Sequence, residues 1–373
     1  MVDLHGQYLR LKEEIDKAML SVIDSSAFIN GREVKDFCSH LSDYLQVPYV
    51  IPCGNGTDAL QIALMALPLQ PGDEVIIPAF TYVAAAEVVA LLGMTPVLVD
   101  VDPYTFNIDP KQIKEAINSN TRAIIAVHLF GQSCDMAPIL QLAEKHNLYV
   151  VEDNAQSIGA DYTFPDGHTK KTGTMGHIGT TSFFPSKPLA CYGDGGAIFT
   201  HNPQWAEQLK MIANHGQKNK YYHQTIGCNS RLDTLQAAIL DVKLKYLDSF
   251  NKARQKVAAR YDEAFASLDG VVTPKQSPFS SHVYHQYTLQ LSPDKRDDVR
   301  AYLKENGVPS MVYYPLPIDE QEAYRQITRL PGFLDNSARL SRSVLSLPIH
   351  TEMTDEEQDY IIQTVISALE TVR

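Results

Sequence analysis

Three polar stretches of the chain carry residue types that could do chemistry, and the first places a lysine among aromatic residues. In SFFPSKPLACYGDGGAIFT (182–200), Lys187 lies between an aromatic run and a glycine-rich turn. A lysine on a loop is usually a solvated surface residue, yet a charged amine is rarely placed beside aromatic side chains without a partner. Phe183, Phe184 and Leu189 indicate a lined cavity. Lys187 is therefore a candidate covalent anchor or base.

The second stretch, CGNGTDAL (53–60), follows an apolar run and opens a helical pattern. Gly56 and Thr57 would place free amides and a hydroxyl at a helix N-terminus, which is a ready phosphate cradle. The same letters also resemble the G-x-G-x-x-A fingerprint of an NAD-dependent dehydrogenase, or a plain strand-to-helix turn. The fingerprint expects an acid after the next strand, whereas Asp73 and Glu74 precede it. The phosphate cradle is the favoured interpretation.

The third stretch, VVEDNAQSIGA (150–160), ends an apolar run in an acid. Asp153 could cap a following helix, which is a common use of aspartate. It could instead face a ligand at the end of a buried strand. Gln156, three residues later, could complete a capping box or reach the same ligand.

Taken together, the three stretches match the needs of one cofactor. A phosphate cradle, a buried carboxylate and a desolvated lysine at strand ends are what pyridoxal 5′-phosphate (PLP) requires. Lys187 would form the Schiff base with its aldehyde, and Asp153 would keep the ring nitrogen protonated. Gly56, Thr57 and Ser182 would bind the phosphate. A dinucleotide would have no use for the lysine.

The elements that must position these residues follow from apolar periodicity. Helical spacing is seen over residues 8–22 and 34–45. Buried strands are predicted at 49–53, 74–78, 96–100, 122–130, 148–153, 180–185 and 197–200, with helical patterns between most of them. Strands alternating with helices predict a mainly parallel, doubly wound α/β sheet. Ligands of such sheets bind at the carboxyl ends of the strands, where the three stretches lie.

The alternation of strand and helix patterns ends near residue 232, which indicates a second domain. Residues 232–268 form one long helical pattern, or two helices joined near 248–249. A strand within 282–292, a helix at 297–307 and a strand at 311–315 follow. We therefore predict a large cofactor-binding domain over 1–245 and a smaller C-terminal α/β domain over 246–373.

Composition excludes several classes of function. The chain has 32 Lys and Arg against 44 Asp and Glu, a net charge of −12, which disfavours nucleic-acid and anionic-membrane binding. No apolar stretch is long enough to span a membrane. The five cysteines are widely spaced, without a C-x-x-C pair, so free thiols in a reducing cytoplasm are expected. His215 and His223 are poorly spaced for a metal, and no metal site is predicted.

The motif set as a whole is similar to a known family over nearly the whole chain. NGTDAL, GDEVIIPAFTYVA, VHLFGQSCDM, VEDNAQSIGA, FFPSKPLACYGDGGA and GCNSRLDTLQAAIL resemble the DegT/DnrJ/EryC1/StrS sugar aminotransferases, which are fold-type I PLP enzymes. The resemblance implies that Tyr82 stacks on the cofactor ring and that Gln156 contacts its phenolic oxygen. It also implies a homodimer with shared active sites, in which Asn229 reaches the phosphate of the neighbouring subunit. Some members are dehydratases with histidine in place of the lysine, so Lys187 favours transamination.

The resemblance also suggests a substrate. It is strongest to the branch that aminates C3 of UDP-linked 2-acetamido-3-keto uronic acids, with L-glutamate as donor, for surface polysaccharides such as lipopolysaccharide. Arg231 would then pair with an acidic sugar or the donor carboxylate, or else form a helix-start ion pair. Tyr313 and Tyr314 stand where the family usually has His-Tyr, and His215 lies on a loop that could line the substrate entrance or be plain solvated surface.

The alternatives are an aminotransferase for a dTDP-linked 3-keto or 4-keto deoxysugar, a nicotinamide-dependent dehydrogenase, and a noncatalytic relative that binds cofactor and a partner.

Overall fold

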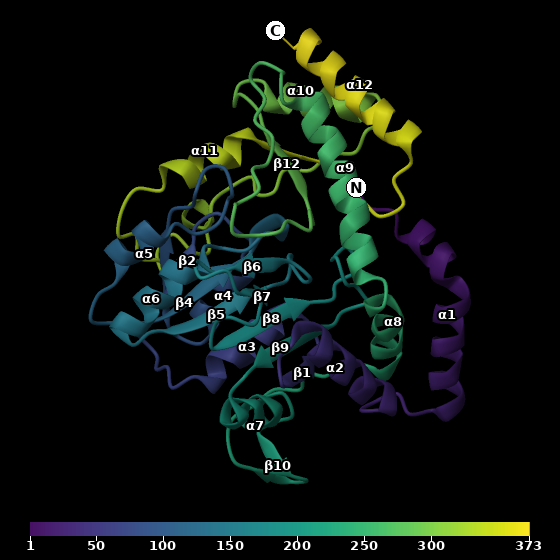
Figure 1. The fold of residues 1–373 in the computed structure, drawn as a ribbon. Coiled ribbons are helices and arrows are strands. Elements are labelled where there is room, and N and C mark those ends of the chain that lie inside the picture. Colours follow the sequence, from purple (N-terminus) through teal and green to yellow (C-terminus); the bar gives the residue numbers. More distant parts are fainter. Residues whose placement is uncertain (373) are drawn as a thin grey trace.

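The computed structural model describes residues 1–372 and contains a seven-stranded sheet flanked by helices (Figure 1). Its strands are β1 (Tyr49–Cys53), β2 (Glu74–Pro78), β3 (Thr95–Val99), β4 (Thr121–Val127), β5 (Tyr149–Asp153), β8 (Ile178–Ser182) and β9 (Gly196–Thr200). The strand order is β1-β9-β8-β5-β4-β2-β3, and β9 runs antiparallel to both of its neighbours. The other pairings are parallel, so the predicted mainly parallel sheet is confirmed.

Helices cover both faces of this sheet, as a doubly wound fold requires. They are α3 (Gly56–Ala66), α4 (Ala84–Leu91), α5 (Pro110–Ala116), α6 (Met136–His146) and α7 (Pro203–Ile212). Successive strand residues point to opposite faces. Ile77, Ile125 and Val151 therefore pack in one apolar cluster with α3 and α4, whereas their neighbours Ile76 and Ile124 pack with α5 and α6.

Two pairs of helices frame one end of the sheet. α1 (Leu4–Ser25) lies along α8 (Thr234–Leu244), and α2 (Arg32–Leu45) also packs on α8 (Figure 1). α9 (Leu247–Phe265) continues from α8 after a break at residues 245–246, slightly before the predicted junction near 248–249. The hydroxyl of Tyr246 contacts Glu14 of α1 at this break. The predicted domain boundary at 245, which stays a prediction, falls at the same place.

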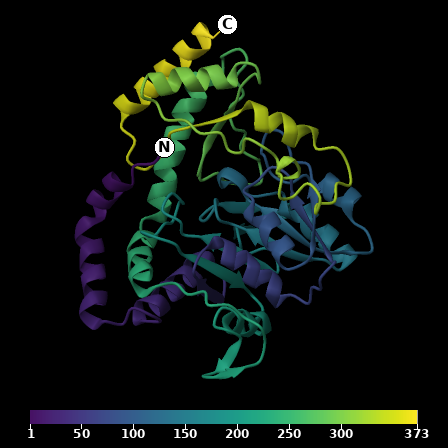
Figure 2. The same cartoon turned by 180° about the vertical axis from the view of Figure 1, so that it is seen from behind.

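Much of the C-terminal part lies at the end of α9 that is far from α8 (Figure 2). It contains β12 (Tyr287–Gln290), α10 (Arg296–Glu305), α11 (Asp335–Ser343), β13 (Val344–Leu347) and α12 (Asp355–Thr371), with β12 and β13 antiparallel. Smaller elements elsewhere are η1 (Leu129–Gly131), β6 (Asp161–Thr163), β7 (Thr169–Lys171), β10 (Gln217–Asn219), β11 (Tyr222–His223) and η2 (Ile318–Glu320).

The strand predicted at residues 311–315 is wrong. Only Met311 pairs with a strand, through an isolated bridge in which it exchanges backbone hydrogen bonds with Ser346 at 3.1 and 2.7 Å. The chain then leaves the small sheet, because the ring of Tyr314 packs on Phe80 of the large sheet's core instead of extending the ladder. None of the described helices is long and apolar enough to cross a membrane.

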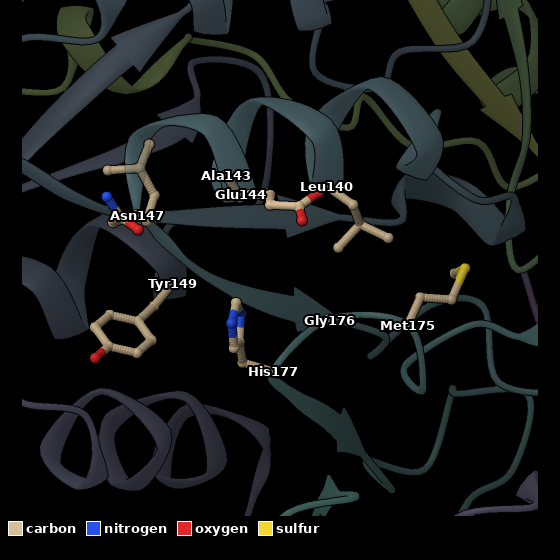
Figure 3. A pocket seen from close by; sticks show the side chains of 9 residues that line it. Leu140, Ala143, Glu144, Asn147, Tyr149, Met175, Gly176 and His177 are labelled. Atoms are coloured by element: carbon tan, nitrogen blue, oxygen red, sulfur yellow. The ribbon is translucent and has the colours of Figure 1, made fainter.

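A cavity of about 530 Å³ opens between α6 and the loop before β8, lined among others by Glu144, Tyr149 and His177 (Figure 3). Tyr149 is the first residue of β5, whereas the candidate acid Asp153 is the last. At about 3.3 Å per residue, the two ends of this strand lie about 13 Å apart. The cavity is therefore at the amino edge of the sheet, away from the residues that carry the candidate chemistry.

Candidate active site

Asp153 and Gln156 lie at the carboxyl end of β5. The backbone N–H of Ala155 donates to Asp153 Oδ1 at 3.0 Å, which orients the carboxylate. Gln156 is buried, and its amide group is held at both ends. Its Oε1 accepts from the Phe130 N–H at 2.7 Å, and its Nε2 donates to the Tyr314 hydroxyl at 3.2 Å. One hydrogen of that Nε2 remains free for a ligand, because an amide nitrogen has two.

Lys187 lies on the loop that follows β8, where its backbone N–H donates to the Phe184 carbonyl at 2.8 Å. The residue is partly buried. This burial lowers the pKa of Lys187 to about 8, against the opposing effect of the Asp153 charge. Burial likewise raises the pKa of Asp153, with the Ala155 amide and Lys187 opposing the rise.

The lysine and the acid are therefore neighbours that influence each other's charge. No ion pair joins their side chains within the described part of the chain. This is the relation expected of an anchor and a counter-ion that act on different atoms of one ligand, rather than of a structural salt bridge.

The start of α3 forms a bare backbone surface against the end of β8. The Asn55 side chain caps the helix by accepting from the Asp58 N–H at 2.8 Å. The first amides of a helix have no intrahelical acceptor, so they are available to an anion. A β-carbon at Gly56 would lie 2.7 Å from Ser182 Cβ and 3.2 Å from its Oγ, so only glycine fits here. The start of α3 thus packs directly against the end of β8, and its unpaired amides beside the Ser182 hydroxyl fit the phosphate of PLP.

Aromatic side chains lie beside Gln156. Tyr82 is 58% exposed, so its ring is available to a ligand, and its centroid lies 6.3 Å from that of Tyr314. The Tyr314 ring also packs edge-on against Phe80 at 6.0 Å, and the ring of half-buried Tyr313 lies 5.8 Å away. Burial raises the pKa of Tyr314, so its hydroxyl stays protonated at neutral pH.

The remaining predicted residues form a separate group on the segment after α7. Asn229 and His215 are exposed, and Asn229 pairs with Asn214 through a backbone bridge. One guanidinium nitrogen of Arg231 donates to Asn214 Oδ1 at 3.5 Å, and His223 Nδ1 donates to the His215 carbonyl at 2.8 Å. None of these hydrogen bonds reaches Lys187 or Asp153. Within residues 1–372 no cluster of three or more acids, histidines or cysteines is placed to hold a metal ion.

Ser230 links the two groups, and the sequence did not single it out. Its hydroxyl accepts from the Gly54 N–H at 2.8 Å and donates to Asp58 Oδ2 at 2.6 Å. Asp58 therefore turns toward Ser230. The sequence could not reveal this contact, because Ser230 and Asp58 are 172 positions apart in the chain. The segment that carries Asn229 and Arg231 is thus fastened to the first turn of α3.

A lysine and an acid at strand ends, with a bare helix N-terminus on a doubly wound sheet, define the fold and site of a fold-type I PLP enzyme. Residues 9–366 match the sequence profile of the DegT/DnrJ/EryC1/StrS aminotransferase family, and the chain belongs to this family.

Two curated relatives and one solved structure illustrate the similarity. The UDP-2-acetamido-2-deoxy-3-oxo-D-glucuronate aminotransferase of Pseudomonas aeruginosa is 46% identical over 94% of each chain. The pleiotropic regulatory protein of Geobacillus stearothermophilus is 45% identical over 98% of this chain and 97% of its own. The structure of DesV from S. venezuelae superposes with a TM-score of 0.94 at 37% identity, covering 100% of this chain and 98% of that one.

The protein is therefore a PLP-dependent aminotransferase, as predicted from the three stretches. Similar solved structures contain PLP or its aminated form, pyridoxamine 5′-phosphate (PMP), which agrees with the predicted cofactor. The dehydrogenase interpretation of CGNGTDAL is wrong, because the chain is an aminotransferase.

Proposed function

We propose that this aminotransferase moves an amino group from L-glutamate to C3 of a UDP-linked 2-acetamido-3-keto uronic acid, for bacterial surface polysaccharide such as lipopolysaccharide. The observation that carries the substrate class is the 46% identity, over 94% of each chain, to an enzyme named for such a UDP-sugar. The second candidate is a dTDP-linked keto sugar, which is favoured by 37% identity over 98% of this chain to a dTDP-sugar transaminase of Streptomyces venezuelae.

When bound, PLP supplies an aldehyde that carries the amino group between donor and acceptor and a ring that withdraws electrons from the substrate carbon. Lys187 would hold the cofactor through its side-chain nitrogen, and its free amine would move the proton at the substrate carbon. Its pKa of about 8 keeps about a tenth of the amine neutral at pH 7, so the base is available.

The other residues orient the cofactor. Asp153 would keep the proton on the ring nitrogen, because its carboxylate would accept a hydrogen bond from it. The free amide hydrogen of Gln156 would donate to the phenolic oxygen. Gly56, Thr57 and Ser182 bind the phosphate through backbone amides and hydroxyls. Exposed Tyr82 covers the ring and restricts access of water to it.

Four further residues would contact the substrates. Arg231 pairs its planar guanidinium with the sugar carboxylate or with that of glutamate. Tyr313 and Tyr314 would contact the sugar on the side where Tyr82 lies, and His215 would line the substrate entrance. We further propose a cytoplasmic homodimer, in which Asn229 of one subunit binds the phosphate held by the other.

Half-reaction spectroscopy tests the substrate. Glutamate should convert the purified enzyme to its pyridoxamine form, with loss of the band near the visible–ultraviolet boundary. UDP-linked 3-keto uronic acids should restore that band faster than dTDP-linked sugars, and the reverse order would favour the second candidate. Lys187→Ala should lack the band from the start. An enzyme that glutamate cannot convert, even with keto sugars present, would favour a noncatalytic role like that suggested by the name of the G. stearothermophilus relative.

Mixing two inactive variants tests the shared site. Lys187→Ala and Asn229→Ala homodimers should both be nearly inactive. In a mixed dimer, one of the two sites has both wild-type residues, so activity should reappear after subunit exchange. A monomer in light scattering, or no recovery from mixed dimers, would contradict the shared arrangement.

A further inference from the structure

A second carboxylate, Glu152, lies directly behind Asp153 on β5. Adjacent strand residues point to opposite faces of a sheet, so Glu152 is directed away from the face that presents Asp153. Its side chain is completely buried. Its four donors are His128 Nε2 at 2.8 Å and the backbone amides of Gly173 at 2.8 Å, Met175 at 2.6 Å and Gly176 at 2.5 Å. A carboxylate has about four acceptor positions, so all of them are used.

His128 fixes one side of this arrangement. Its Nδ1 accepts from the Cys134 N–H at 3.0 Å, so a neutral ring carries its proton on Nε2 and donates it to Glu152. The backbone of His128 also binds Asp153 and the segment that follows it. Its N–H donates to the Asp153 carbonyl at 3.0 Å, and its carbonyl accepts from Ser157 Oγ at 2.9 Å. The turn after β4 is thus attached twice to the end of β5 and once to the segment that follows it.

The loop before β8 fixes the other side. Three of its amides bind the Glu152 carboxylate, and Thr180 Oγ1 donates to the Glu152 carbonyl at 3.1 Å. The loop packs closely on β8, because a β-carbon at Gly179 would lie 1.9 Å from the Gly173 carbonyl oxygen. Glu152 therefore holds the end of β5 between two neighbouring loops.

The four donors around Glu152 favour its charged form. Burial alone would raise the pKa of Glu152, but the hydrogen bond and the charge of His128, together with the amides of Gly176 and Gly173, outweigh burial and hold the pKa below its ordinary value. A buried charge is costly to keep when a neutral side chain would fill the same space. No lysine or arginine within the described residues pairs with it. The charge is thus stabilised by donors that also fix the backbone around Asp153.

From this geometry we propose that Glu152 and His128 are positioning residues for Asp153. By tying the end of β5 to the loops on both sides, they set where the Asp153 carboxylate meets the ring nitrogen of the cofactor. The inference rests on the proposed role of Asp153. A purely structural role would affect the binding of any cofactor analogue. A positioning role should affect only ligands that carry the ring nitrogen.

A pair of cofactors tests this dependence. Cofactor-free protein is titrated with PLP and with 1-deazapyridoxal 5′-phosphate, in which C–H replaces the ring nitrogen, and both dissociation constants are measured by fluorescence. Asp153→Asn sets the scale, since it should weaken PLP and leave the deaza analogue nearly unchanged. Glu152→Gln should weaken PLP by about tenfold and the analogue by less than twofold, because a lost charge-assisted network acts through Asp153. The Glu152→Gln/Asp153→Asn double variant should bind PLP no more than about twofold more weakly than Asp153→Asn.

Glu74→Gln is the matched control. Glu74 is also a buried carboxylate of the sheet, bound by Asn118 Nδ2 and Arg329 at 2.9 Å each, but it begins β2 at the opposite edge. It should lower the melting temperature and leave both affinities unchanged. Should Glu152→Gln not fold, His128→Leu removes one donor from the same carboxylate and is judged by the same criteria.

The outcomes separate the inference from the proposed function. If Glu152→Gln weakens both ligands equally, or neither, while Asp153→Asn discriminates between them, the positioning role is overturned and the role of Asp153 stands. If Asp153→Asn does not discriminate, the proposed role of Asp153 fails and the inference fails with it. Discrimination by both variants supports the inference.

Discussion

Gly56→Ala tests whether the start of α3 is the phosphate cradle. The added methyl would lie 2.7 Å from Ser182 Cβ, whereas two such carbons normally stay about 3.5–4.0 Å apart. The helix start and the end of β8 must therefore separate by about 1 Å, and overpacking of this kind costs about 1–3 kcal/mol. If the strain is relieved at the cradle, affinity for PLP should fall by about 5- to 150-fold.

The assay is fluorescence titration of cofactor-free protein with PLP and with pyridoxal, which lacks the phosphate. Gly56→Ala should weaken PLP and leave pyridoxal nearly unchanged, because only the phosphate uses the cradle. Adding Ser182→Gly removes the clashing carbon, so the double variant should bind PLP no worse than Ser182→Gly alone. Equal losses for both ligands, or wild-type affinity for PLP in Gly56→Ala, would refute this placement of the phosphate.

Three further predictions follow from the pKa values and contacts of the site. In cofactor-free protein, the rate at which an amine-directed reagent labels Lys187 should rise with pH around a midpoint near 8, because burial lowers its pKa and only the neutral amine reacts. Lys243→Met should leave that profile unchanged, although burial lowers the pKa of Lys243 to about 8 as well, and a midpoint above 10 would contradict the buried setting. Tyr314→Phe removes the hydroxyl that accepts from Gln156 at 3.2 Å, so PLP affinity should drop by about two- to tenfold, and an unchanged dissociation constant would show that this contact does not orient the amide. Arg231→Lys should raise KM for the acidic sugar or for glutamate more than it lowers kcat, since the bidentate pairing is lost; steady-state kinetics with each substrate varied identifies which one, and an unchanged KM for both would remove Arg231 from the substrate site.

The sequence predicted the mainly parallel sheet well, for physical reasons, and it also supplied the candidate residues, whose roles stay predictions. Buried parallel strands read as short apolar runs, so β5 was found from VVED and its end identified Asp153. Chemistry at such strand ends needs polar residues in otherwise apolar surroundings, and this contrast singled out Lys187 as a candidate. Family motifs then placed the chain in an aminotransferase family, and the profile match over residues 9–366 confirms this.

Direction and long-range contacts could not be read in the same way. The run at 197–200 predicts a strand, but apolar letters do not say that β9 runs antiparallel to its neighbours. The apolar run at 311–315 is typical of a strand, yet the packing of Tyr314 on Phe80 takes this segment away from the ladder. Glu152 reads as an ordinary acid, since its amide donors come from a loop more than 20 positions away.

The fastening of Ser230 to Gly54 and Asp58 has a thermodynamic consequence. If Arg231 binds a substrate as we propose, a substrate that displaces the 229–231 segment would also disturb the first turn of α3. Linkage would make this effect reciprocal, so that a phosphate bound at α3 and a substrate bound at Arg231 would change each other's affinity by the same factor. Cutting that tether with Ser230→Ala would make the two affinities independent.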